Sequence, residues 1–196
     1  MDDPYAVDRR GFLKTGATAA AATAVACGAP EGRWRALTNE EARTLAAACD
    51  QVVPPDDSPG AAEAGGVVFI DRQLATREKD QLPTWQQGVR ALDAIAQQRK
   101  GMTFAQLPFE DQTALLQDVE AGQVPATVWG ELDPQAFFGR LVRYTMMGFY
   151  GDPRHGGNRQ HVSWRMLGVP PTPIRGRLHE VRAVAVATPT LKKKEG

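Results

Sequence analysis

Polar side chains that could do chemistry gather in one Gly-rich segment near the C-terminal end of the chain. Between residues 151 and 165 the sequence places one carboxylate and two imidazoles, Asp152, His155 and His161. Carboxylate oxygens and imidazole nitrogens are common ligands of zinc and other transition metals. Their spacing follows no helical face and matches no familiar metal-binding motif, so the pattern does not favour a metal site.

Two other interpretations of this segment remain open. In the first it is a packed loop, in which Gly156 and Gly157 adopt positive φ and Asn158 bonds to nearby backbone. In the second it docks onto a partner protein, because arginine and tryptophan are enriched at binding hot spots. The residues predicted to dock are Arg154, His155, Asn158, Arg159, Trp164 and Arg165.

The rest of the chain contains no recognisable catalytic motif. Asp56 and Asp57 could approach a calcium ion, but one short loop supplies too few oxygen ligands, and a solvated turn capping the next helix is favoured. The two serines, Ser58 and Ser163, lie in no GxSxG elbow. The sequence also lacks GxGxxG and CxxCH motifs. It therefore predicts no catalytic, cofactor-binding or metal-binding residues in this chain.

The charge of the chain argues against general nucleic-acid binding. Lysine plus arginine number 23, and aspartate plus glutamate also number 23. A balanced chain has no overall positive field to attract a polyanion.

The N-terminal end resembles a twin-arginine export signal over residues 1–26. The predicted signal residues are Arg9, Arg10, Phe12, Leu13 and Lys14, and a short Ala- and Thr-rich stretch follows them. Ala24-Val25-Ala26 satisfies a small-x-small cleavage rule, and it also forms a weak lipobox that would make Cys27 a lipidation site. Both outcomes stay open. The other cysteine, Cys49, lies in an apolar helical run and is expected to be a small buried hydrophobe.

The elements that must position these residues are predicted to be helical. After a linker over 27–36, hydrophobic periodicity and capping signals predict helices near 38–53, 62–79, 83–100, 110–120 and 135–149. The last is apolar over more than half its circumference, Met146 included, and is expected to be the central helix. We predict one all-α domain of about five helices over 37–171, with a long Gly/Pro-rich C-terminal loop and an extended or disordered tail over 172–196.

Two segments carry a resemblance to a known family. The first runs from Val52-Val53-Pro54-Pro55 through Asp71-Arg72-Gln73-Leu74, and the second runs from Gly148-Phe149-Tyr150-Gly151 through Leu167-Gly168-Val169-Pro170. Both resemble the small (gamma) subunit, or subunit 3, of membrane-associated gluconate 2-dehydrogenase. The resemblance implies a complex in which a large subunit binds FAD and oxidises a sugar or sugar acid. A cytochrome c subunit, where present, carries haem c and passes electrons to quinone.

The hypothesis that follows is a non-catalytic accessory subunit of a periplasmic FAD-dependent dehydrogenase. The resemblance implies that it escorts the large flavoprotein subunit through the twin-arginine export machinery and stabilises it. It would then lie in the periplasm or at the outer face of the cytoplasmic membrane, held by the complex or by a lipid on Cys27. One alternative is a stand-alone exported lipoprotein or binding module without a dehydrogenase partner. Another is a small metalloenzyme that uses the His155 loop.

Overall fold

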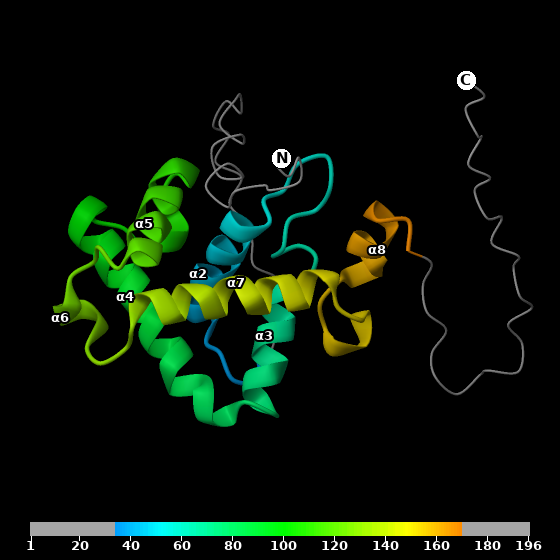
Figure 1. Ribbon diagram of the computed structural model, residues 1–196, viewed down its shortest axis with the longest axis horizontal. Coiled ribbons are helices and arrows are strands. Elements are labelled where there is room, and N and C mark those ends of the chain that lie inside the picture. Colours follow the sequence, from blue (N-terminus) through cyan, green and yellow to red (C-terminus); the bar gives the residue numbers. More distant parts are fainter. Residues whose placement is uncertain (1–33, 170–196) are drawn as a thin grey trace, which may run out of the picture.

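The computed structural model describes residues 34–169, and this part of the chain is built of helices (Figure 1). The five longer helices are α2 (Asn39–Val52), α3 (Gly66–Ala75), α4 (Leu82–Lys100), α5 (Phe109–Ala121) and α7 (Pro134–Tyr150). Two short helices are α6 (Ala126–Trp129) and α8 (Val162–Met166), and single 3-10 turns are η1 (Lys79–Gln81), η2 (Phe104–Gln106), η3 (Pro153–His155) and η4 (Arg159–His161). The described residues contain no strand, and the prediction of an all-α fold with about five main helices is confirmed.

Several predicted features lie outside the described residues. These are the export signal over 1–26 with Arg9, Arg10, Phe12, Leu13 and Lys14, the cysteine Cys27, most of the 27–36 linker, and the tail over 172–196. Within residues 34–169, no helix is both long and apolar enough to cross a membrane.

The start of α2 shows how local sequence sets a helix boundary. The Thr38 hydroxyl accepts a hydrogen bond from the Glu41 N–H at 3.2 Å, and the Glu41 carboxylate accepts one from the Thr38 N–H at 2.9 Å. This reciprocal capping satisfies two backbone donors that the first turn leaves unpaired. The helix ends at Val52, just before Pro54 and Pro55, as predicted.

Helix α7 lies at the centre of the fold, as its apolar sequence predicts. It contacts α2, α3, α4, α5 and α8, and Figure 1 shows it crossing the body in front of the other helices. An aromatic cluster holds it to α4 and α6: Trp85 packs edge-on against Phe137 and Tyr144, and Phe137 also packs against Trp129. Such pairs contribute about 0.5–1.5 kcal/mol beyond their buried area.

The predicted second helix is longer than the observed one. Helix α3 begins at Gly66, four residues after the predicted start at Ala62, and it ends at Ala75, four residues before the predicted end at Lys79. Gly65 has φ of +91°, a left-handed conformation that breaks any continuous helix through Ala62–Gly66. At the other end Thr76 leaves the helical region, and its hydroxyl donates to the Arg72 carbonyl at 2.6 Å.

Asp71 fixes the end of the predicted linker against α3. Its buried carboxylate accepts hydrogen bonds from the backbone N–H groups of Arg35, Ala36 and Leu37, at 2.9 to 3.1 Å. The chain therefore enters the helical body at a defined point beside α3. Nothing in the local sequence predicted this contact, because it joins residues more than thirty positions apart.

Candidate functional site

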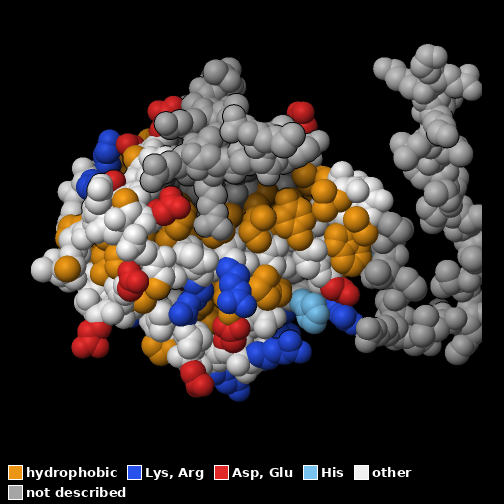
Figure 2. Space-filling model, in the orientation of Figure 1, with side chains coloured by type: hydrophobic (Ala, Val, Ile, Leu, Met, Phe, Trp, Pro, Cys, Tyr) orange, Lys and Arg blue, Asp and Glu red, His pale blue; other side chains and the backbone are white. Residues whose placement is uncertain are grey.

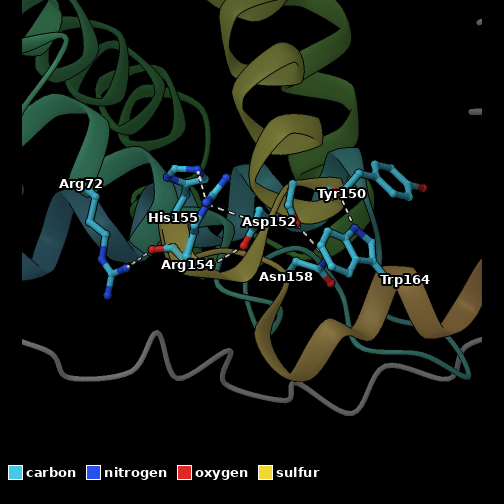
Figure 3. A network of polar contacts seen from close by, with 8 residues as sticks. Arg72, Tyr150, Asp152, Arg154, His155, Asn158 and Trp164 are labelled. Carbon is cyan, nitrogen blue, oxygen red and sulfur yellow. Dashed lines mark hydrogen bonds and ion pairs between the residues drawn. The ribbon is translucent and has the colours of Figure 1, made fainter. Parts of the chain in front are cut away.

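The Gly-rich loop begins where α7 ends, and its first turn is closed by Asp152. The Asp152 carboxylate accepts a hydrogen bond from the Arg154 N–H at 3.0 Å and pairs with the Arg154 guanidinium, Nε to Oδ2, at 3.2 Å (Figure 3). The Arg154 Nε also lies 3.3 Å from His155 Nε2. The turn thereby presents the exposed Arg154 beside the half-buried His155.

Asn158 holds the middle of the loop from inside. Its side chain is completely buried, donates to the Gly151 carbonyl at 2.9 Å and accepts from the Ser163 N–H at 3.0 Å. One amide thus joins the end of α7 to the start of α8. This agrees with the packed-loop interpretation for Asn158, which cannot itself touch a partner's surface while it is buried.

The two glycines of the loop serve different purposes. Gly156 has φ of +107°, as predicted, whereas Gly157 does not have positive φ. A Cβ on Gly157 would collide with the carbonyl oxygen of Gly148, so this glycine is required for a close approach of the loop to α7. The prediction of positive φ at Gly157 was wrong, because local sequence does not reveal which backbone will pack against it.

The loop also contains a run of backbone strain that the sequence did not indicate. Asn158, Gln160 and His161 have φ of 44°, 54° and 58°, and they are the only residues other than glycine with positive φ in the described chain. The left-handed conformation costs an L-residue roughly 1–2 kcal/mol. The bonds of Asn158, together with one from the Arg159 N–H to the Ala64 carbonyl at 2.9 Å, hold the segment in place.

The two sequence segments singled out by their resemblance pack against each other. Ala64 and Gly65 come from the first segment and meet the second at Arg159 and Gly156, where a Cβ on Gly65 would lie 2.6 Å from the Gly156 carbonyl oxygen. A Cβ on Gly148 of the second segment would lie 3.1 Å from the Cα of Gly66 of the first. The two segments therefore build one structural unit from α3, the end of α7 and the loop.

The predicted docking residues surround this unit, but they are not equally exposed. Arg154, Arg159 and Arg165 are exposed, His155 and Trp164 are half-buried, and Asn158 is buried. The Trp164 indole donates to the Tyr150 carbonyl at 2.9 Å (Figure 3). Its ring centroid lies 5.3 Å from that of His161. Trp164 is thus fixed by α7 and keeps part of its surface open.

An exposed apolar surface adjoins the loop. We call it the methionine patch; the exposed fractions of its residues are 40% for Met146, 45% for Met147, 39% for Tyr150, 50% for Met166 and 62% for Leu167. Figure 2 shows hydrophobic side chains gathered over the C-terminal half of α7 and towards α8. Met146, one of the apolar residues of the predicted central helix, is exposed because α7 is apolar over a wider arc than the core covers.

The described residues do not form a metal centre. Across residues 34–169, no three histidine, cysteine, aspartate or glutamate side chains come together to hold an ion, and Asp152, His155 and His161 are no exception. Asp56 instead closes its own turn by accepting a hydrogen bond from the Ser58 N–H at 2.7 Å.

Two side chains, those of Cys49 and Tyr144, have a raised pKa that their positions in the fold explain. Cys49 is fully buried, accepts a hydrogen bond from the Thr145 hydroxyl at 3.3 Å, and has its pKa raised by burial to about 12. Burial, together with a hydrogen bond from its hydroxyl to Glu78, raises the pKa of Tyr144. Glu78 and Tyr144 line a depression of about 530 Å³ between the α3–α4 connection and α7.

Comparison with known proteins gives one match. Searches against curated proteins and against solved structures found no significant similarity. The sequence model of one family, described as gluconate 2-dehydrogenase subunit 3, matches residues 39–171. That range covers well over half of the chain and includes α2 to α8 with both packed segments. The chain therefore belongs to the gluconate 2-dehydrogenase subunit 3 family and is an accessory subunit of a dehydrogenase.

Proposed function

We propose that this chain is the non-catalytic small subunit of a periplasmic, membrane-associated, FAD-dependent dehydrogenase for sugars or sugar acids. It escorts the flavoprotein subunit through twin-arginine export and stabilises it afterwards. FAD belongs to the large subunit, and haem c belongs to a cytochrome subunit where one is present. The observation that carries the proposal is the methionine patch beside a loop held in a strained conformation.

The patch has the composition of a protein-binding surface. Methionine, tyrosine, tryptophan and arginine are enriched at protein interfaces, and unbranched methionines adapt to irregular partner surfaces. Here Met146, Met147 and Tyr150 are exposed near the end of α7, and Trp164 bonds to the Tyr150 carbonyl. Arg159 and Arg165 are exposed in the segment that follows. An apolar centre with a charged rim favours docking onto a protein partner.

Rigid positioning supports the same proposal. The three left-handed residues of the loop cost free energy that a loop without a role in recognition would avoid. Asn158 and Gly157 hold the loop against α7, so Arg159, Trp164 and Arg165 are ordered before a partner arrives. Preorganisation of this kind reduces the entropic cost of binding.

The N-terminal sequence supports the export part of the proposal. Arg9 and Arg10 would present the complex to machinery that moves folded proteins, which suits a partner that must bind its flavin before export. The test is to express the large subunit with and without this chain and to assay dehydrogenase activity in the periplasm. We expect exported activity only with the chain. Equal activity in both cases would contradict the escort role.

Two sets of variants separate export from docking. Replacing Arg9 and Arg10 by lysine should leave an active complex in the cytoplasm. Met147→Asp and Met166→Asp should each weaken the purified complex about tenfold or more, because a charge would be buried in the interface. Gln98→Asp adds the same charge at an exposed position of α4 and should leave affinity unchanged. If no partner binds the wild-type chain, the stand-alone lipoprotein alternative gains support.

A further inference from the structure

A second surface, separate from the methionine patch, collects positive charge. A pocket of about 440 Å³ opens beside α3, and its lining includes Arg35, Arg72, Thr76, Arg77, Arg154 and His155. These residues come from three places in the sequence: the entry into α2, the end of α3, and η3. Figure 2 shows basic side chains on the side of the molecule below α7, with acidic side chains among them.

The three segments that form the pocket are fixed to one another. Asp71 pins the backbone of Arg35 to α3 with bonds of 3.0 Å. The Arg72 guanidinium donates to the Arg154 carbonyl at 3.4 Å, which joins α3 to η3 (Figure 3). Gly156 packs so closely on Arg72 that a Cβ there would lie 3.0 Å from its Cδ. The pocket therefore exists before any ligand binds.

The positive charge of the pocket is only partly neutralised. None of the lining residues is acidic. The carboxylate of Asp71 is buried and accepts hydrogen bonds from backbone N–H groups, and that of Asp152 pairs with Arg154. Arg77 also lines the neighbouring depression that contains Glu78 and Asp80. Within residues 34–169, Arg35, Arg72 and Arg77 form no ion pair with an acidic side chain. Like charges that line one pocket repel one another, and a bound anion would relieve that repulsion.

We propose that this pocket binds a phosphate group. A guanidinium offers several N–H donors in one plane. One guanidinium can therefore bind both oxygens of a carboxylate, whereas several are needed to surround the terminal oxygens of a phosphate. The group can belong to free phosphate or to a phospholipid headgroup. The proposal does not depend on a dehydrogenase partner.

The test is a titration of the full-length chain with inorganic phosphate at constant ionic strength, followed by NMR. We expect saturable shifts of residues around Arg35, Arg77 and Arg154, and weaker binding of acetate. Arg35→Gln and Arg77→Gln, which remove exposed side chains that hold no other element in place, should each weaken phosphate binding about tenfold. Arg90→Gln removes the same charge from an exposed position of α4 and should have no effect.

Binding to lipid vesicles distinguishes a phospholipid headgroup from a soluble phosphate compound as the ligand. Cosedimentation with phosphatidylglycerol vesicles, lost in Arg35→Gln and Arg77→Gln and absent with phosphatidylcholine, would assign the site to anionic headgroups. Phosphate binding without such cosedimentation would assign it to a soluble phosphate compound. The proposal is overturned if neither phosphate nor vesicles bind, if acetate binds as tightly as phosphate, or if Arg90→Gln weakens binding as much as the pocket variants do.

Discussion

The buried side chain of Asn158 accepts a hydrogen bond from the backbone N–H of Ser163 at 3.0 Å, and through it the start of α8 is joined to the end of α7. The same amide donates to the Gly151 carbonyl, so its two polar atoms bridge both ends of the loop. Asn158 therefore helps to hold the surface that carries Arg159 and Trp164, together with the bonds of these two residues to the Ala64 and Tyr150 carbonyls.

Asn158→Ala should therefore destabilise the loop strongly. It leaves the Gly151 carbonyl and the Ser163 N–H without their partner, and it places alanine in a left-handed conformation. Together these effects should lower the free energy of unfolding by about 2–4 kcal/mol. Urea denaturation measures the change. Asp57→Ala, at an exposed turn position, serves as control and should change stability by less than about 0.5 kcal/mol. An unchanged midpoint for Asn158→Ala would contradict the bridging role.

Two glycine substitutions should change the stability of the protein in opposite directions. Gly157→Ala forces a methyl group against the Gly148 carbonyl and should cost about 2 kcal/mol or more, since backbone has to move. Gly139→Ala, on α7 with open space around its Cβ, should stabilise the chain by about 0.5–1 kcal/mol, because alanine favours helix. Thermal unfolding of both variants gives the comparison. Destabilisation by both to a similar extent would show that the Gly157 contact is not specific.

Asp93 should make stability depend on pH. Burial raises the pKa of its carboxyl, although hydrogen bonds from the Phe104 N–H and the Thr44 hydroxyl oppose the rise. Because the folded state holds this proton more tightly than the unfolded state, the contribution of Asp93 is fully present below its unfolded pKa of about 3.8 and is lost as pH rises through the folded value.

Asp93→Asn should remove that dependence and should be at least as stable as the wild type at pH 7, since an amide carries no charge to desolvate. Urea denaturation at several pH values, with Asp57→Asn as control for the loss of one exposed carboxylate, measures the effect. A wild type and an Asp93→Asn variant with parallel pH profiles would contradict the assignment.

Cys49 should be chemically inert in the folded protein. With a pKa of about 12, only about one thiol in ten thousand is ionised at pH 8, and the side chain is fully buried. In a chain carrying Cys27→Ser, a thiol reagent should label Cys49 at least a hundredfold more slowly than in denaturant. Rapid labelling without denaturant would show that α2 and α7 separate readily around the Cys49–Thr145 contact.

Local signals predicted the main helices well. The capping pair Thr38 and Glu41, the proline at position 83, and Gly101 with φ of +71° all act within a few residues of the boundary they set. The ends of α3 were missed because Gly65 is held left-handed by a loop ninety residues away. Helix boundaries that depend on distant packing have no signature in the local sequence.

Some features of the candidate site could likewise be predicted from the sequence, and others could not. The residue types of the 152–165 loop indicated a packed or docking segment, and the burial of Asn158 follows from its ability to bond backbone groups. The methionine patch could not be located, since periodicity shows that α7 has excess apolar surface but not which side is left uncovered. The basic pocket could not be predicted from the sequence, because Arg35, Arg72 and Arg154 are far apart in the chain and come together only in the folded protein.

The contact of Asp71 with the backbone of Arg35 also sets the length of a tether. Only eight residue steps separate Cys27 from Arg35, and a fully extended chain spans about 28 Å over that distance. If Cys27 carries a lipid, Arg35 can lie no farther than this from the bilayer. Arg35 also lines the basic pocket, so the anchor would hold that pocket within reach of the headgroups.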